Sequence, residues 1–173
     1  MLYVDDRISV HGLNNTNTKE TLSPEKTAII FIGIPASGKS SFFAKQFKDK
    51  CVHINLDTVN TRNKEMVLLD KCLKANESFV VDNTNPTKAD RQRYIIPAKA
   101  AGYHVEGYFF QSILADCISR NDNRTGKAKI PDIAIVSKSN ELELPTMDEG
   151  FDALYFVKLE KDNFIVDDWR DEP

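Results

Sequence analysis

The sequence predicts an α/β domain of three layers, with helices on both faces of a central, mostly parallel sheet of five strands. The first observation is length, because 173 residues are typical of one domain. The second is that short apolar runs alternate with helical patterns, which is the order of a parallel sheet with crossover helices. The third is a glycine-rich turn between the first apolar run and the first helical pattern.

The strands are expected in the five apolar runs, at Thr27–Ile32, Cys51–Ile54, Phe79–Val81, His104–Phe110 and Ala153–Lys158. Runs such as AIIFI and FVV are continuous, which fits strands buried on both faces. The helices are expected between the strands, at Lys39–Lys48, Lys64–Ala75, Thr87–Ala101 and Ser112–Asn121. The third helix has start and stop signals, with Asp90 three residues after Thr87 and Gly102 just past its end.

The chain divides into a polar N-terminal extension at residues 1–26, a core domain at 27–158 and an acidic C-terminal tail at 159–173. Residues 123–150 break the alternation of strands and helices. They hold the basic NRTGKAKI, the possible short helix PDIAIVSKS and the acidic connector ELELPTMDEG. An insertion of this length before the last strand fits a lid, which we place at about 120–145.

Charge and composition limit the functions that the chain can have. The net charge is −3, and the tail holds six acids against Lys161 and Arg170, so the remaining residues are nearly neutral. This argues against a broad surface that coats nucleic acid. The longest apolar run is far too short for a membrane span, and residues 1–27 lack the apolar stretch of a secretory signal. We therefore expect a cytoplasmic protein without membrane contact.

The cysteines and the single tryptophan add little chemistry. Cys51, Cys72 and Cys117 are odd in number and widely spaced, so we expect reduced thiols rather than a disulfide or a zinc site. Trp169, in the acidic tail, is expected to pack on the body of the domain rather than stack on a base.

The segment Gly33–Ser40, GIPASGKS, fits the pattern G-x-x-x-x-G-K-[ST] of the P-loop. Its glycines let backbone N–H groups converge on phosphate oxygens at the start of the following helix. Lys39 would reach the β- and γ-phosphates, and Ser40 would offer its hydroxyl to Mg²⁺. The strand before and the helix after favour this reading over a glycine-rich turn without ligand. The pattern predicts a P-loop NTPase-type fold that binds ATP or another nucleoside triphosphate with Mg²⁺.

Two acids follow neighbouring strands and should open onto the same crevice as the P-loop. Asp57 lies where an acceptor hydroxyl could approach the γ-phosphate, and a carboxylate there can accept the proton of that hydroxyl. The alternative is that Asp57 caps the next helix. Asp82 ends an apolar strand and could hold Mg²⁺ through water, or it could simply begin a turn.

Arg120 and Arg124 are four residues apart and so share one helix face at the start of the expected lid. Two guanidiniums that close over phosphates would stabilise charge in a transition state. A solvated basic stretch that also includes Lys127 and Lys129 explains the same pattern.

Other charged residues carry no predicted chemistry. Arg91 and Arg93, on the third helix, are expected on a solvated surface. The histidines His11, His53 and His104 lack the spacing of metal ligands, and we assign them no role.

Several of these motifs together resemble the kinase domain of polynucleotide 5′-hydroxyl kinases, from about residue 27 to 158. GIPASGKSSF resembles their P-loop, and VHINLDT resembles the strand that carries their catalytic acid. DNTNPTKADRQRY and LELPTMDEGF are similar to segments of the mammalian kinase-phosphatase, and RNDNR matches the lid arginines of the phage enzyme. The phosphatase motif D-x-D-G-T and a ligase lysine motif are absent from the sequence, so it resembles a kinase module alone.

The resemblance implies a role for each matching position. Catalytic roles fall to Asp57 as general base and to Lys39, Arg120 and Arg124. Nucleotide-binding roles fall to Gly33, Pro35, Ala36, Ser37, Gly38, Lys39, Ser40, Ser41, Arg120 and Arg124. Mg²⁺ would be held near Ser40 and Asp82, and the acceptor near Asp57, Asp82, Asn85 and Arg62.

The chain departs from this family beside the expected base. Leu56 stands where the family usually has an arginine, and Asn60 stands where the phage enzyme has an arginine that contacts the phosphate of the acceptor. Arg62, two positions after Asn60, could substitute for that second arginine. In spite of these two departures, the resemblance favours transfer of the γ-phosphate to the 5′-hydroxyl of DNA or RNA. It leaves open a small-molecule acceptor, such as a nucleoside, sugar or antibiotic, and a nucleotide-binding module without phosphotransfer whose groove the acidic tail could cover.

Overall fold

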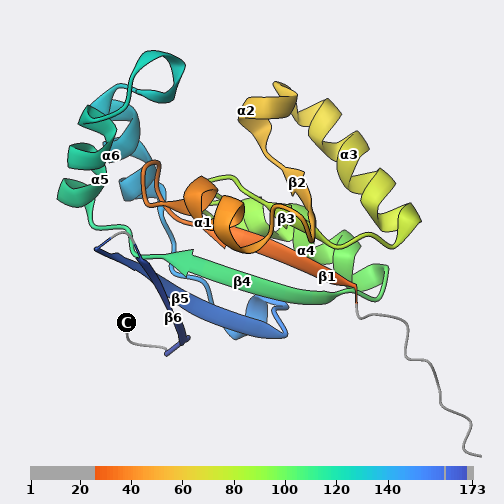
Figure 1. Cartoon of the computed structure of the whole chain (residues 1–173). Coiled ribbons are helices and arrows are strands. Elements are labelled where there is room, and N and C mark those ends of the chain that lie inside the picture. The colour runs from red at the N-terminus through yellow and green to blue at the C-terminus, as the bar shows by residue number, and fades with distance from the viewer. Residues whose placement is uncertain (1–25, 162, 171–173) are drawn as a thin grey trace, which may run out of the picture.

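A six-stranded sheet forms the centre of the molecule in the computed structural model, which describes residues 26–161 and 163–170. In the order β2-β3-β1-β4-β5-β6, the first five strands are parallel and β6 is antiparallel (Figure 1). The strands are β1 Thr27–Ile32, β2 Val52–Ile54, β3 Phe79–Val81, β4 His104–Phe110, β5 Ala153–Glu160 and β6 Asn163–Asp168. The predicted mostly parallel sheet is confirmed, with one strand more than expected.

The helices alternate with the strands as predicted, and one short helix was not expected. They are α1 Lys39–Gln46, α2 Leu56–Val59, α3 Arg62–Ala75, α4 Lys88–Ala100, α5 Leu114–Asp122 and α6 Asp132–Glu141. Short 3-10 turns occupy Gly126–Ala128 and Met147–Glu149. The start signal of α4 is confirmed, because the Thr87 side chain accepts a hydrogen bond from the Asp90 backbone N–H at 3.1 Å.

Helices cover both faces of the sheet, as the alternation of side chains along β1 requires. Ala28, Ile30 and Ile32 face the core formed with α3 and α4. Ile29 and Phe31 face α1 on the opposite side. Every residue of β1 after Thr27 is buried, which agrees with its continuous apolar sequence.

The helices α5 and α6 lie together beyond the carboxyl ends of the strands (Figure 1). They pack on the P-loop through a small apolar cluster of Ile34, Ala36, Cys117 and Ile135. The predicted short helix in PDIAIVSKS corresponds to α6. We call the segment from α5 to α6, residues 114–141, the lid.

The segment expected as an acidic tail contributes to the sheet, because residues 159–160 end β5 and residues 163–168 form β6. Trp169 packs on the rings of Phe109 and Phe156, at centroid distances of 5.4 and 6.5 Å, which confirms that it docks on the body. Phe164 packs on Phe42 of α1 at 5.0 Å. The described part of this segment thus lies at the sheet edge rather than across the site.

Three expectations concern the rest of the chain. The N-terminal extension at residues 1–26 lies outside the described residues except for Lys26. Within residues 26–161 and 163–170, no helix combines the length and apolar character that crossing a bilayer requires. All three cysteines lie in the described residues, and each is a free thiol.

Candidate active site

The P-loop lies between β1 and α1, at the carboxyl edge of the sheet. Gly38, the N-cap residue directly before α1, has a φ of 101°, and Ala36 also has a positive φ of 66°. Among the described residues, no side chain caps the N-terminus of α1, so within this part of the chain the first N–H groups of the helix have no side-chain partner. This end of α1 therefore offers the donors and the positive dipole that a phosphate requires.

Neighbouring loops hold the start of the P-loop in place. The Gly33 N–H donates to the Thr84 carbonyl at 3.0 Å, and the Ile34 N–H donates to Ser112 Oγ at 3.2 Å. A Cβ on Gly33 would lie 3.1 Å from that of Phe110, so only glycine fits without displacement. The other predicted P-loop residues range from buried to exposed: Ser37 is buried, Pro35 is half-buried and Ser41 is exposed.

Lys39 folds back over the P-loop. Its Nζ donates to the carbonyls of Gly33 and Ile34, both at 2.8 Å, and its residue is only 8% exposed. Burial lowers the pKa of Lys39 to about 8, although the nearby Asp82 carboxylate opposes the shift. A bound phosphate would restore the favourable environment of the charged ammonium.

Ser40 and Asp82 meet where β1 and β3 end side by side. The Ser40 hydroxyl donates to Asp82 Oδ2 at 2.7 Å, and His53 Nε2 lies 3.0 Å from the same oxygen. Asn55 donates to the Asp82 backbone carbonyl at 2.8 Å. Burial alone would raise the pKa of Asp82, but hydrogen bonds from His53 and Ser40 and the charge of Lys39 bring the pKa below its ordinary value.

These donors fit a divalent ion of the kind predicted. Ser40 and Asp82 supply hard oxygen ligands within hydrogen-bond distance of each other, beside the phosphate-binding end of α1. Among the described residues, no group of three or more His, Cys, Asp and Glu side chains is placed to hold a metal. A site of one carboxylate and one hydroxyl is usual for Mg²⁺, which takes its other ligands from water and phosphate.

Asp57 lies on the one-turn helix α2, directly after β2. The cap of this helix is Asn55, whose side chain accepts from the N–H of Asp57 at 2.9 Å and of Thr58 at 3.3 Å. Asp57 does not cap the next expected helix, because Thr61 caps α3 and Asn55 caps α2. Asp57 is exposed, and among the described residues its carboxylate makes no hydrogen bond or ion pair. It follows β2, which is parallel to β3 and so ends at the sheet edge that carries the P-loop, and its charge opposes the lowering of the Lys39 pKa.

The other two residues predicted to bind the acceptor, Arg62 and Asn85, have different surroundings. Arg62, the first residue of α3, donates through Nη1 to Glu65 at 2.7 Å and to the Tyr94 hydroxyl at 2.8 Å. Its side chain is still 44% exposed. Asn85 is buried, and its amide donates to the Phe31 carbonyl at 2.8 Å. The prediction that Asn85 contacts an acceptor does not fit this placement, because its amide secures the loop after β3 to β1.

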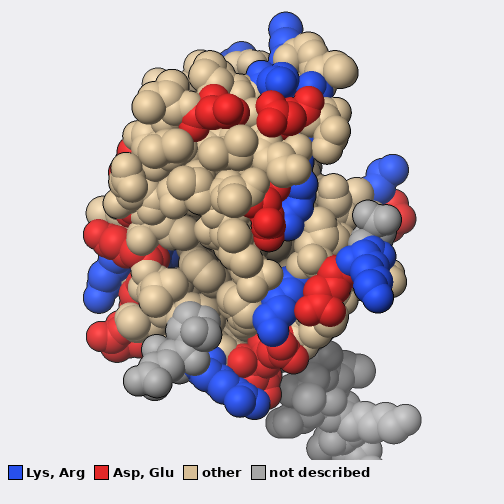
Figure 2. All heavy atoms as spheres, turned by 90° about the vertical axis from the view of Figure 1, so that its left-hand side faces the viewer, with Lys and Arg blue, Asp and Glu red and all other residues tan. Residues whose placement is uncertain are grey.

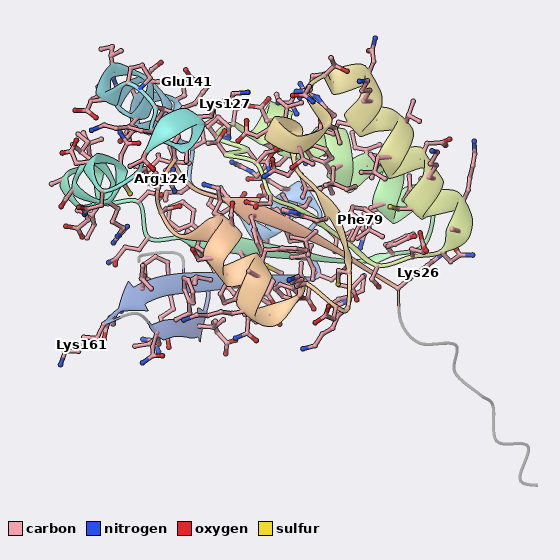
Figure 3. The ribbon with its side chains drawn as sticks, turned by 45° about the horizontal axis from the view of Figure 1, so that its top comes forward. Lys26, Phe79, Arg124, Lys127, Glu141 and Lys161 are labelled. Atoms are coloured by element: carbon pink, nitrogen blue, oxygen red, sulfur yellow. The ribbon has the colours of Figure 1, made fainter. Side chains whose placement is uncertain are left out.

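The arginines of the lid lie beside the P-loop. Arg120 Nη1 donates to the Ala36 carbonyl at 3.1 Å, and the Arg124 charge acts on Lys39. Figure 3 shows Arg124 on the lid, near the start of α1. Lys127 lies on the next turn of the lid, and Lys129 pairs with Asp122 at 3.1 Å. The P-loop, Asp57, Asp82 and both arginines are thus brought to one edge of the sheet.

The expectation that Arg91 is solvated is wrong. Arg91 is fully buried and pairs with Glu149 through two contacts of 2.7 Å, from Nε to Oε2 and from Nη2 to Oε1. Its Nη1 donates to the carbonyls of Asn85, Pro86 and Glu143. The pair therefore joins the loop after β3 to the connector between the lid and β5.

Sequence reasoning missed several residues of the site. His53 has no ligand spacing, and only the fold brings it to Asp82, 29 residues away. Asn55 could have been found, because an asparagine before a short polar run is a common helix cap. Glu65 and Tyr94 are buried beside Asn83, and no local pattern indicates this.

Figure 2 shows the face that carries α5 and α6. Basic and acidic side chains alternate there, and the described residues on this face form no continuous basic surface. This agrees with the nearly neutral charge of residues 1–158 and gives no broad electrostatic track for a nucleic acid.

Comparisons with known proteins relate the chain to one family and to named kinases. The family model described as "AAA domain" matches residues 29–143. The "Putative bifunctional polynucleotide phosphatase/kinase" of Acanthamoeba polyphaga mimivirus is 32% identical over 158 residues, which cover 84% of this chain and 37% of the viral protein. The "Bifunctional polynucleotide phosphatase/kinase" of Schizosaccharomyces pombe is 28% identical over 75% of this chain and 33% of the yeast protein.

This chain therefore spans about a third of the length of these two relatives. Among solved structures, a chain of the "Pnkp1/Rnl/Hen1 RNA repair complex" matches with a TM-score of 0.60 and 21% identity, over 72% of this chain and 46% of that chain. That likeness supports the α/β P-loop fold.

Proposed function

Since this chain belongs to the AAA domain family, we propose that it transfers the γ-phosphate of ATP to the 5′-hydroxyl end of a polynucleotide, DNA or RNA. The observation that carries this proposal is the exposed Asp57 carboxylate at the same sheet edge as the P-loop. The relatives named polynucleotide phosphatase/kinases support the choice of acceptor.

The P-loop would hold the phosphates of ATP. Backbone N–H groups from Gly38 to Ser41, at the start of α1, bind the phosphate oxygens, and Lys39 exchanges its bonds to the loop carbonyls for the β- and γ-phosphates. Ser40 and Asp82 would hold Mg²⁺, which neutralises charge on the phosphates when bound. Hydrogen bonds from His53 and Ser40 and the charge of Lys39 lower the pKa of Asp82, and the Asn55 amide holds Asp82 in position for this role.

The transfer itself needs a base and an in-line acceptor. Asp57 accepts the proton of the 5′-hydroxyl while the oxygen of that hydroxyl forms a bond to the γ-phosphorus. The bond from that phosphorus to the β,γ-bridging oxygen breaks, and ADP leaves with the electron pair. Arg120 and Arg124 donate to the oxygens of the transferred group, where negative charge is spread in the transition state.

Arg62 is the cation that we propose for the acceptor phosphate. Leu56 cannot supply a charge beside Asp57, but Arg62 begins the next helix. Within the part of the chain that the structure describes, it is bonded to Tyr94 and Glu65 through Nη1 only. The exposed remainder of its guanidinium can donate to a phosphodiester. Substitution Arg62→Gln should then raise the KM for a 5′-hydroxyl oligonucleotide more than the KM for ATP.

The test uses labelled ATP, Mg²⁺ and a 5′-hydroxyl oligonucleotide. Wild-type protein should transfer label, and Asp57→Asn should lower kcat at least about a hundredfold while ATP binds normally. Asp70→Asn is the matched control, because Asp70 is an exposed aspartate on α3 that pairs with Lys74. No transfer by wild type would refute the proposal, and equal rates in Asp57→Asn would refute the assigned base.

A second candidate is a kinase for a small-molecule hydroxyl. It is favoured by Leu56 and Asn60 and by the mixed charges of the face in Figure 2. Transfer to a nucleoside or sugar, with none to an oligonucleotide, would select it. A nucleotide-binding module without phosphotransfer would bind ATP and transfer label to neither kind of acceptor.

A further inference from the structure

A buried polar network lies beside the base, apart from the P-loop. Its centre is Glu65, which is completely buried on α3. Glu65 accepts hydrogen bonds from Arg62 Nη1 at 2.7 Å and from Asn83 Nδ2 at 2.6 Å. Tyr94 is also fully buried, and its hydroxyl lies 2.8 Å from Arg62 Nη1 and 3.2 Å from Asn83 Nδ2.

Stability alone is a poor reason for this network. A buried carboxylate loses its hydration, and buried ion pairs are often no more stable than apolar packing of the same volume. Burial raises the pKa of Tyr94 to about 12, and the Glu65 charge adds to the shift, so the hydroxyl keeps its proton. The network therefore has one fixed pattern of donors and acceptors over the neutral pH range.

The network ends at the backbone of the helix that carries the base. Asn83 uses its Nδ2 for Glu65 and Tyr94, which leaves Oδ1 turned to the Leu56 N–H at 2.9 Å. Leu56 is the first residue of α2 and directly precedes Asp57. A four-residue helix cannot be stable alone, so its position depends on such external bonds.

We propose that Asn83 is a positioning residue, whose side chain is oriented by Glu65 and Tyr94 so that it fixes α2 and the carboxylate of Asp57. Asn55 holds the same turn from the other side, through the N–H groups of Asp57 and Thr58. The assignment rests on the proposed function, because Asp57 is the base only if the chain is a kinase. Asn83 itself is not expected to touch the phosphates or the acceptor.

A swap of donor and acceptor gives a sharp test. In Asn83→Asp, the side chain can still accept from the Leu56 N–H, but it faces Glu65 with a second carboxylate and no donor. In the double variant Asn83→Asp with Glu65→Gln, the introduced amide at position 65 donates to the introduced carboxylate at position 83. The oxygen of that amide still accepts from Arg62. The double variant therefore restores a matched donor and acceptor between positions 65 and 83 and keeps the net charge of the wild-type pair. The Tyr94 hydroxyl then donates to position 83 instead of accepting from it.

The expected kinetic result is a split between kcat and ATP binding. Asn83→Asp should lower kcat for the oligonucleotide about tenfold to a hundredfold, because a small misplacement of a base is costly, with ATP affinity within about twofold. The double variant should recover kcat to within about threefold of wild type. The matched control is Tyr103→Phe, which removes a buried hydroxyl bonded to the carbonyls of Cys72 and Glu77 and should leave kcat unchanged.

Amide hydrogen exchange at Leu56 provides a readout that does not need activity. Protection of this N–H should fall about fivefold in Asn83→Asp or Asn83→Ala and return in the double variant. Two results would overturn the inference while the proposed function stands. One is a folded Asn83→Ala variant with normal kcat, and the other is a folded double variant whose kcat is no higher than that of Asn83→Asp. If wild type phosphorylates no oligonucleotide, the proposed function fails, and unchanged Leu56 protection in Asn83→Ala would overturn the positioning as well.

Discussion

Glu149→Gln should destabilise the domain strongly, because it leaves the guanidinium of Arg91 buried without a counter-ion. Both side chains are almost completely inaccessible, at 0% and 2% exposure, and the pair is held through two contacts of 2.7 Å. Removal of one partner from a buried pair costs about 3–5 kcal/mol of unfolding free energy. For a domain of this size, that corresponds to a fall in Tm of roughly 10 °C.

A double-mutant cycle separates the lost charge pair from the lost packing. Arg91→Met should cost about as much as Glu149→Gln, since it strands the carboxylate and deprives three backbone carbonyls of a donor. The double variant Arg91→Met with Glu149→Gln contains no stranded charge. Its loss should be about 1–3 kcal/mol, smaller than the sum of the two single losses.

The assay is urea denaturation followed by the fluorescence of Trp169, which is the only tryptophan of the chain. Asp70→Asn is the control, because the Asp70–Lys74 pair is exposed and its loss should cost less than about 0.5 kcal/mol. Single losses below about 1 kcal/mol, or losses that simply add, would refute the reasoning. Either result would mean that water or a rearranged partner satisfies the stranded charge.

Three further predictions concern the P-loop and the sheet edge. Burial lowers the pKa of Lys39 to about 8, so its ammonium loses its charge above that pH. In calorimetric titrations, MgATP should therefore bind about tenfold more weakly at pH ~9 than at pH ~7. The Lys39→Arg variant stays charged over this range and should lack the dependence on pH. Gly38→Ala should weaken ATP binding at least about tenfold, because φ is 101° and the new Cβ would lie 3.2 Å from Phe164; normal affinity would contradict this. Trp169→Ala should cost about 2 kcal/mol in denaturation followed by circular dichroism, and an unchanged midpoint would show that the contacts of the Trp169 ring with Phe109 and Phe156 do not stabilise the domain.

The parallel core and the P-loop could be predicted because their signals are local. The run at Thr27–Ile32 is apolar at nearly every position and is buried on both faces, and Gly38 stands where the backbone needs a positive φ. The Asp57 and Asp82 positions followed from the rule that parallel strands end at one edge. The structure brings both residues to that edge.

The remainder depends on contacts between distant segments. Arg91 resembles any helix-surface arginine until Glu149, 58 residues away, is packed against it. The strand β6 was missed because Asp167 and Asp168 make its sequence resemble a solvated tail. In an edge strand such charges are tolerated and discourage pairing with other chains.

The hairpin of β5 and β6 has a consequence for the extent of the domain. Its Phe164 packs on α1 and lies against Gly38, so a strand far along the chain forms part of the wall behind the phosphate-binding turn. A shortened protein that stops at residue 158, where the alternation of strands and helices ends, would lose this wall. We expect any minimal version of the domain to need the chain through residue 170, and an excised or transplanted P-loop without it to bind nucleotide poorly.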